Sequence, residues 1–210
     1  MSLRLLLADD HIVVRQSLRA MLEREGFQVL AEASNGQEAV RLAAACRPQV
    51  AVLDLNMPLL NGMEAAREIL KQAPQTRCVL LTVHTEDHYV LEAVRVGISG
   101  YVLKTKSSSE LVHAIQEAAR GAMYLSADIS ATVVRAYLTK AEPTPEVLGN
   151  RERQVLQLVA EGKTTKEIAG LLGVSTKTAE SHRGHIMEKL EIHNTAGLVR
   201  YAIRRGLIQP

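Results

Sequence analysis

The chain of 210 residues has no tryptophan, a single phenylalanine and only two cysteines. Because large aromatic rings are almost missing, any hydrophobic core has to be built from aliphatic side chains. Cys46 and Cys78 lack metal-ligand spacing and have no histidine beside them, which argues against a zinc site and against a disulfide. We expect both to be buried free thiols in a reducing compartment.

Long hydrophobic runs are missing as well. No segment reaches the roughly 18 apolar residues that cross a bilayer, and residues 1–4 lead straight into strand-like sequence instead of a signal peptide. With 47% hydrophobic and 23% charged residues, the composition is that of a globular chain and not of a disordered one. The sequence therefore predicts a soluble, cytoplasmic protein with no membrane partner.

The net charge of +2 is small but unevenly distributed. Residues 1–121 contain 13 Lys/Arg and 14 Asp/Glu, whereas residues 148–210 contain 10 Lys/Arg and 6 Asp/Glu. Such a basic excess indicates an anionic partner for the C-terminal part, although many solvated surfaces carry a similar excess.

The first 120 or so residues alternate short aliphatic runs with amphipathic stretches, an order typical of a parallel sheet covered by helices. The expected strands are Arg4 to Ala8, Gln28 to Ala33, Val50 to Asp54, Arg77 to Thr82 and Gly100 to Leu103. The prediction is an α/β fold with a doubly wound, five-stranded parallel sheet. In such a sheet the ligand binds outside the carboxyl ends of the strands.

Prolines mark the end of this pattern. A helical stretch with Ile129, Val133 and Tyr137 gives way to a segment with Pro143 and Pro145, which is typical of a linker. The residues that follow show helix caps and no strand-like alternation. We therefore expect an α/β domain at residues 1–121, a linker with a helical stretch at 122–147 and an all-α domain at 148–210.

Polar side chains stand at the carboxyl ends of four expected strands. They are Asp9 and Asp10 after the first, Asp54 at the third, Thr82 at the fourth and Lys104 after the fifth. Parallel strands bring these ends to one edge, where three carboxylates would raise one another's pKa unless a cation neutralised them. An all-oxygen site of this kind suits Mg²⁺. With the cation and an ammonium group nearby, Asp54 can attack a phosphorus centre.

The segments around these residues resemble the receiver domain of bacterial response regulators. The resemblance rests on LLLADD, on LDLNMPLLNG around Asp54, on LLTV with Thr82 and on GYVLK ending at Lys104, and it covers residues 1–121. It implies a flavodoxin-like sheet with strand order 2-1-3-4-5 and a sensor histidine kinase as a partner. It also implies that Asp54 accepts the phosphoryl group and that Lys104 contacts it.

The resemblance further assigns a Mg²⁺ site and a switch. Asp10, Asp54 and the backbone carbonyl of Asn56 would bind the metal directly, and Asp9 would bind it through water. Thr82 would follow the phosphoryl group, and Tyr101 would swing between outward and inward positions as Thr82 moves. An ordinary half-buried ring on the last strand is the other interpretation of Tyr101.

Three further positions bear on the expected site. We expect His11 and His84 at the surface beside the acidic residues, with His84 a candidate for tuning phosphorylation rates. Thr105 replaces the proline that often follows the lysine in the family. This difference affects the expected geometry of the loop after Lys104 and not the expected phosphoryl chemistry.

The C-terminal part carries the pattern of a helix-turn-helix. Thr164 and Glu167 form a capping box at the start of a short helix that Gly173 ends, and Ser175 caps a second helix. The apolar positions 179, 186 and 190 mark the inward stripe of this second helix. Its outward stripe contains or borders Lys177, Glu180, Ser181, Gly184 and Glu188.

Gly184 lies in the middle of this second helix, where a glycine costs about 1 kcal/mol relative to alanine. Close approach of DNA would explain that cost. Helix packing or sequence drift would explain it equally well.

Residues 148–208 resemble the LuxR/NarL type of DNA-binding domain, with Arg151 and Glu152, the run KEIA, and Lys189 and Leu190 at family spacing. Gly149 and Ala179 replace the usual Thr and Val, which affects packing detail more than DNA contacts. The implied partner is double-stranded promoter DNA. The resemblance assigns base edges to Glu180, Ser181 and Gly184, and phosphates to Lys177, Thr178, His182, Arg183 and Lys189, with Thr165 and Lys166 as additional candidates. It also implies a homodimer that forms on DNA or after phosphorylation, with contacts through a last helix at Thr195 to Arg205. RNA polymerase is a further candidate partner.

Two other functions fit parts of the pattern. A phosphohydrolase of the haloacid dehalogenase type would also use Mg²⁺ and an aspartate nucleophile, but it needs a general-acid aspartate two residues later, where this chain has Asn56. A regulator with a vestigial receiver site would work without phosphorylation. A single acidic residue at a strand end often only caps a helix. The conjunction of five polar residues instead favours a phosphorylation-controlled, DNA-binding response regulator and not an enzyme.

Overall fold

The computed structural model describes residues 2–85, 87–126, 129 and 147–208, without the side chains of residues 87 and 88. The chain divides into two compact units, Met1–Glu142 and Pro143–Pro210, and each is described by itself. Within the described ranges, no helix has the length and apolar character needed to cross a membrane.

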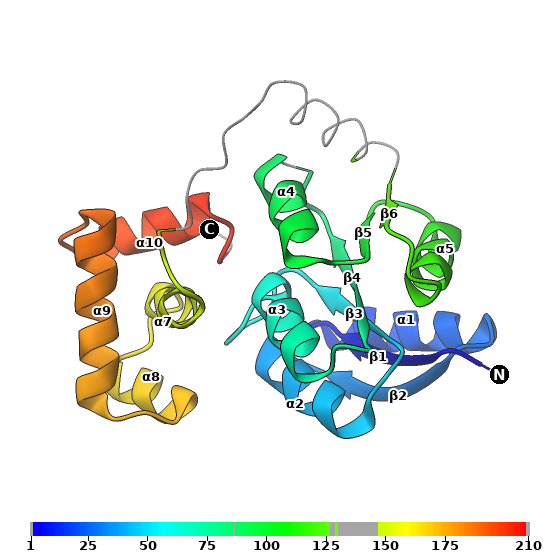
Figure 1. The fold of residues 1–210 in the computed structure, drawn as a ribbon, viewed down its shortest axis with the longest axis horizontal. Helices are drawn as coiled ribbons and strands as arrows, with labels where there is room; N and C mark the ends of the chain where they lie inside the picture. The colour runs from blue at the N-terminus through cyan, green and yellow to red at the C-terminus, as the bar shows by residue number, and fades with distance from the viewer. Residues whose placement is uncertain (1, 86, 127–128, 130–146, 209–210) are drawn as a thin grey trace. The chain divides into compact units, whose positions relative to one another are not determined.

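The N-terminal unit is a parallel β-sheet with helices on both faces (Figure 1). Its strands lie in the order β2-β1-β3-β4-β5-β6. They are β1 (Arg4–Ala8), β2 (Gln28–Ala33), β3 (Val50–Asp54), β4 (Arg77–Thr82), β5 (Gly100–Leu103) and β6 (Tyr124–Leu125). The helices are α1 (Ile12–Arg24), α2 (Gly36–Cys46), α3 (Gly62–Gln72), α4 (Asp87–Val96) and α5 (Ser108–Ala119). The predicted fold class is confirmed, and the first five strands have the predicted bounds and order.

Alternate side chains along the strands contribute to two hydrophobic cores. Leu5 and Leu7 of β1 pack in the core that contains residues of α1 and α5, whereas Leu6 and Ala8 pack in the core that contains residues of α2, α3 and α4. All five residues of β3 are buried, as expected of a central strand in a parallel sheet.

The two cysteines are free thiols in this unit. Cys78 on β4 is fully buried, and this burial raises its pKa to about 12. Cys46 is the last residue of α2 and is only half-buried, because the end of the helix reaches the surface. The prediction of burial was therefore right for Cys78 alone.

The sheet contains one strand more than predicted. Strand β6 pairs in parallel with β5, with Leu125 opposite Tyr101, so residues expected in the linker belong to the sheet. Ile129 is fully buried in the same core as Tyr101. A strand of two residues carries no periodicity, and for this reason the sequence pattern did not show it. The rest of the predicted helical stretch and the proline-containing segment lie outside the described residues.

The C-terminal unit is helical, as predicted. Its helices are α7 (Asn150–Ala160), α8 (Thr165–Leu172), α9 (Thr176–Leu190) and α10 (Thr195–Arg204). The capping box of Thr164 and Glu167 begins α8, and Gly173 ends it in the left-handed conformation with φ of 64°. Ser175 caps α9 by accepting a hydrogen bond from the N–H of Thr178. Helices α8 and α9 with this short turn form the expected helix-turn-helix.

Replacing Ile129 by alanine should destabilise the N-terminal unit, because a fully buried side chain would be lost from the core around Tyr101. Changes of this kind cost about 2–5 kcal/mol. Urea unfolding of the full chain, followed by circular dichroism, should show a lower midpoint. Ile12→Ala is the matched control, since Ile12 is 58% exposed and its loss should leave the midpoint almost unchanged. Equal midpoints for the two variants would show that Ile129 does not anchor the segment.

Candidate functional site

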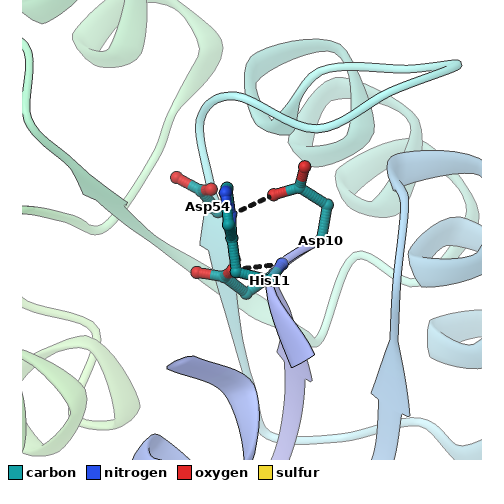
Figure 2. A group of neighbouring side chains, drawn as sticks. Asp10, His11 and Asp54 are labelled. Carbon is teal, nitrogen blue, oxygen red and sulfur yellow. Dashed lines mark hydrogen bonds and ion pairs between the residues drawn. The ribbon is translucent and has the colours of Figure 1, made fainter. Parts of the chain in front are cut away.

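Three carboxylates and one ammonium group meet at the carboxyl ends of β1, β3 and β5. Asp9 and Asp10 follow β1, Asp54 ends β3, and Lys104 follows β5. One ligand atom from each aspartate and one from His11 lie within 4.8 Å of one another, and Figure 2 shows the side chains of Asp10, His11 and Asp54 close together. Asp9 and Asp54 are buried, being 0% and 4% exposed. The structure thus brings the predicted acidic residues together.

Lys104 bridges two of the carboxylates. Its Nζ lies 2.8 Å from Asp9 Oδ2 and 3.0 Å from Asp54 Oδ2. Burial raises the pKa of Asp54, with a smaller contribution from the charge of Asp9, and Lys104 only partly offsets this. Burial also acts to lower the pKa of Lys104, but the hydrogen bond to Asp9 and the charge of Asp54 raise it overall. The site therefore retains an excess of negative charge.

Asp9 is held by donors on both of its carboxylate oxygens. Oδ2 accepts a hydrogen bond from Lys104, and Oδ1 accepts one from the backbone N–H of His11 at 2.8 Å. The imidazole Nδ1 of His11 lies 2.8 Å from Asp10 Oδ1 and 3.5 Å from Asp9 Oδ1. The side chains of Asp10 and His11 are 30% and 69% exposed, so these two residues form the rim of the site.

Glycine is required where the chain passes close to Asp54. A Cβ at Gly62, the first residue of α3, would collide with the backbone carbonyl of Asp54. The N–H of Gly62 donates to the carbonyl of Leu55 at 2.9 Å, and the backbone N–H of Asn56 donates to the Asp54 carboxylate. The loop between β3 and α3 is thereby fixed against the acidic residues.

His84 connects this site to the two predicted switch residues. Its backbone N–H donates to Thr82 Oγ1 at 3.1 Å, and its carbonyl accepts from the Tyr101 hydroxyl at 3.0 Å. Its ring Nε2 lies 3.0 Å from Asn56 Nδ2, and the ring packs on Tyr89 with centroids 4.6 Å apart. Thr82 and Tyr101 are both fully buried, so Tyr101 points inward here. The prediction of a surface position was right for His11, whereas His84 is only partly exposed.

Helix α9 presents a polar face on the side opposite the buried Ala179 and Ile186. The predicted DNA-contacting residues exposed on α9 include Lys177, Thr178, Glu180, Ser181 and Gly184. At the start of α8, Lys166 is exposed and Thr165 is half-buried. Within the C-terminal unit taken by itself, these residues are therefore accessible to a large ligand.

Other predicted DNA contacts have partners within the unit. Arg183 donates to Thr195 Oγ1 at 2.6 Å, and the Nζ of Lys189 lies 2.8 Å from Glu152 Oε2. His182 is half-buried. Sequence periodicity did not indicate these pairings, because each joins α9 to a different helix or to the start of one.

Two family models match the chain. Residues 5–116 match the response regulator receiver domain, and residues 146–202 match the luxR family of bacterial regulatory proteins. The transcriptional regulatory protein MctR of Rhizobium johnstonii is 36% identical over 207 residues, which are 98% of this chain and 95% of that protein. The response regulator UvrY of Escherichia coli K12 is 34% identical over 208 residues, with coverage of 98% and 95%.

A solved structure of RcsB from Salmonella enterica serovar Typhimurium, bound to promoter rprA with a phosphomimetic BeF3-, matches with a TM-score of 0.63. The identity is 25%, over 96% of this chain and 98% of that one. A receiver unit joined to a helix-turn-helix unit defines a switchable regulator of transcription. The chain belongs to the response regulator family with a LuxR-type effector: it is a DNA-binding regulator of two-component signal transduction and not a classical enzyme. The phosphohydrolase alternative is thereby excluded.

Asp54→Asn should stabilise the metal-free protein at neutral pH. Because the folded chain raises the pKa of Asp54, the ionised carboxylate is less stable in the folded state than in the unfolded state. The gain should be fully present above the raised pKa and should vanish as the pH falls toward the ordinary value of 3.8 and below. Urea midpoints in EDTA across this pH range measure it.

Glu68→Gln is the control for removing one carboxylate, since among the described residues Glu68 pairs with the exposed Lys71, and its removal should give no comparable gain. A loss of stability in Asp54→Asn at neutral pH would contradict the electrostatic account of the site.

Proposed function

We propose that Asp54 accepts a phosphoryl group from a sensor histidine kinase and that this controls the binding of promoter DNA. The observation that carries the proposal is the convergence of Asp9, Asp10, Asp54, Thr82 and Lys104 at one edge of the sheet. A vestigial receiver is a poorer explanation, because buried carboxylates close to one another destabilise the folded protein and do not contribute to its packing.

The donor set supports Mg²⁺ as the cofactor. Every carboxylate at the site offers oxygen, the ligand that Mg²⁺ prefers, and the negative charge exceeds what Lys104 neutralises. The exposed side of Asp10 suits a direct ligand, together with Asp54 and the carbonyl of Asn56. Asp9 suits a contact through water, because both of its oxygens already accept hydrogen bonds. When bound, Mg²⁺ would screen the charge between Asp54 and the phosphoryl oxygens.

The residues of this chain have defined parts in the transfer. A carboxylate oxygen of Asp54 attacks the phosphorus while the bond from phosphorus to the kinase histidine breaks, and Lys104 contacts the transferred phosphoryl group. Thr82 then turns its hydroxyl from the N–H of His84 toward the phosphoryl group. The carbonyl of His84 accepts the hydrogen bond from the Tyr101 hydroxyl. Phosphorylation of Asp54 would therefore change the hydrogen bonding of Tyr101 through Thr82 and His84.

Helix α9 is the proposed reading helix, with Glu180 and Ser181 at base edges. Lys177, Thr178, His182, Arg183 and Lys189 would contact phosphates, with Thr165 and Lys166 in addition. The guanidinium of Arg183 has donors beyond the one that bonds Thr195, whereas Lys189 would have to share its charge with Glu152.

The family supports the remaining assignments. We place the receiver at residues 1–121, a linker at 122–147 that begins with β6, and the effector at 148–210. The active form would be a homodimer with contacts through α10, bound to two half-sites about one helical turn apart. Promoter binding places the protein in the cytoplasm, with RNA polymerase as a further candidate partner.

Incubation of the full chain with acetyl phosphate and Mg²⁺ should add one phosphoryl group to wild type and none to Asp54→Asn. The phosphorylated chain should bind a duplex selected from genomic fragments with changed affinity, because Thr82 and Tyr101 respond to the new charge. Mass spectrometry and fluorescence anisotropy measure the two effects, with Glu68→Gln as the control that remains competent. Confirmed phosphorylation of Asp54 without any change in affinity would leave only the phosphorylation-independent regulator.

Lys177→Ala should weaken DNA binding at all sequences alike, because an exposed ammonium group on α9 contacts a phosphate and not a base. The slope of log affinity against log salt concentration should fall by about 1. Lys71→Ala on α3 of the receiver removes a surface lysine of the other unit and should change neither quantity. An unchanged salt slope in Lys177→Ala would remove Lys177 from the interface.

A further inference from the structure

Arg15 of α1 is a largely buried cation beside the acidic residues, and the proposed phosphoryl chemistry gives it no part. Its side chain is 14% exposed. Its Nη1 donates to the backbone carbonyl oxygen of Asp9 at 2.6 Å, and its Nε lies 3.4 Å from Oε2 of Glu32 on β2. Nε is buried and donates no hydrogen bond within the described part of the chain. A buried arginine with such a donor is poorly explained by stability alone.

The carbonyl that Arg15 binds belongs to the peptide between Asp9 and Asp10. Because a peptide is planar, a hydrogen bond that fixes its oxygen also fixes the direction in which the chain continues to the Cα of Asp10. The carboxylate of Asp9 is held separately, by the N–H of His11 and by Lys104. Asp10 lies at the rim, where its carboxylate pairs with the exposed imidazole of His11. The position of Asp10 therefore depends on this peptide plane more than the position of Asp9 does.

Glu32 orients Arg15 from the neighbouring strand. Its Oε2 faces Nε of Arg15, and its Oε1 accepts a hydrogen bond from Nη1 of Arg19 at 2.6 Å. In the register of the sheet Glu32 stands opposite Leu7 of β1, two residues before Asp9. The guanidinium group of Arg15 thus reaches both β2 and the backbone that follows β1. A side chain with a single nitrogen would not make both contacts.

We propose that Arg15 is a positioning residue of the metal site: through the carbonyl of Asp9 it holds Asp10 where its carboxylate binds a divalent cation together with Asp54. This inference rests on the proposed Mg²⁺ site. Groups that orient the ligands of a metal commonly contribute about tenfold or more to its affinity. The positive charge of Arg15 has the opposite effect, because it repels a cation. The geometry and the charge of Arg15 therefore predict opposite changes in Mg²⁺ affinity when the side chain is replaced.

Arg15→Met keeps an apolar stem and removes both the donors and the charge. If Arg15 positions Asp10, the affinity for Mg²⁺ should fall by about tenfold, although a repelling charge has been removed. Arg15→Lys keeps the charge but not the two contacts, so its affinity should fall as well, and it carries the test if Arg15→Met does not fold. Mg²⁺ titrations of the full, unphosphorylated chain, followed through the backbone amide resonances of Asp9 and Asp10, measure the affinity.

Arg19→Met is the matched control. Arg19 lies one turn further along α1 and also pairs with Glu32, but its other contact is with Glu23 and not with Asp9. The variant removes the same charge from the same helix at an exposed position, where salt screens it, and should leave the Mg²⁺ affinity almost unchanged. Melting temperatures in EDTA report the loss of stability in each variant separately from the loss of metal binding.

Weaker Mg²⁺ binding in both Arg15 variants, with normal binding in Arg19→Met, would support the inference. It would be overturned by an affinity at or above that of the wild type in either Arg15 variant, or by an equal loss in Arg19→Met. A lower melting temperature with unchanged Mg²⁺ affinity would leave Arg15 a purely structural role.

Asp10→Asn tests the metal site itself and should lose most of the Mg²⁺ binding, because a charged ligand is removed. If Asp10→Asn loses binding while the Arg15 variants bind normally, only the role of Arg15 is wrong. If Asp10→Asn binds Mg²⁺ as the wild type does, the proposed metal site is wrong.

Discussion

Burial of the Asp9 and Asp54 carboxylates beside the partly exposed Asp10 is the constraint on which the rest of the receiver depends. One ammonium group, that of Lys104, lies between two of them and offsets only part of their charge. The sheet nevertheless holds the carboxylates together, because the carboxyl ends of its parallel strands necessarily share an edge. A site with more carboxylates than ammonium groups is suited to bind a cation, as the proposed phosphoryl transfer requires.

A short series of contacts joins the site to the interior of the receiver. His84 shares hydrogen bonds with Thr82 and Tyr101 and places its ring beside Asn56, so the contacts needed for the proposed switch join the site to a fully buried aromatic ring. Tyr101 and Ile129 belong to one core, so the proposed switch residue is packed in the same cluster as a residue that follows the last strand.

The sequence alone predicted the parts of the molecule that periodicity and residue type encode. Aliphatic runs gave the first five strands, the polar residues at their ends gave the acidic site, and the capping residues Thr164 and Ser175 gave α8 and α9. It did not predict β6, which is too short to have a period. The linking position of His84 was also missed, since two of its bonds use backbone atoms that every residue has. Pairings such as Lys189 with Glu152 depend on tertiary packing.

Strand β6 also affects how the receiver behaves toward other chains. The outermost strand of a sheet presents unpaired N–H and C=O groups, on which a strand of another molecule can be added. By covering β5 next to Gly100 and Tyr101, β6 moves that edge outward and leaves only two residues of strand on which to pair. The first two residues of the longer, apolar strand β5 are thereby closed to intermolecular pairing.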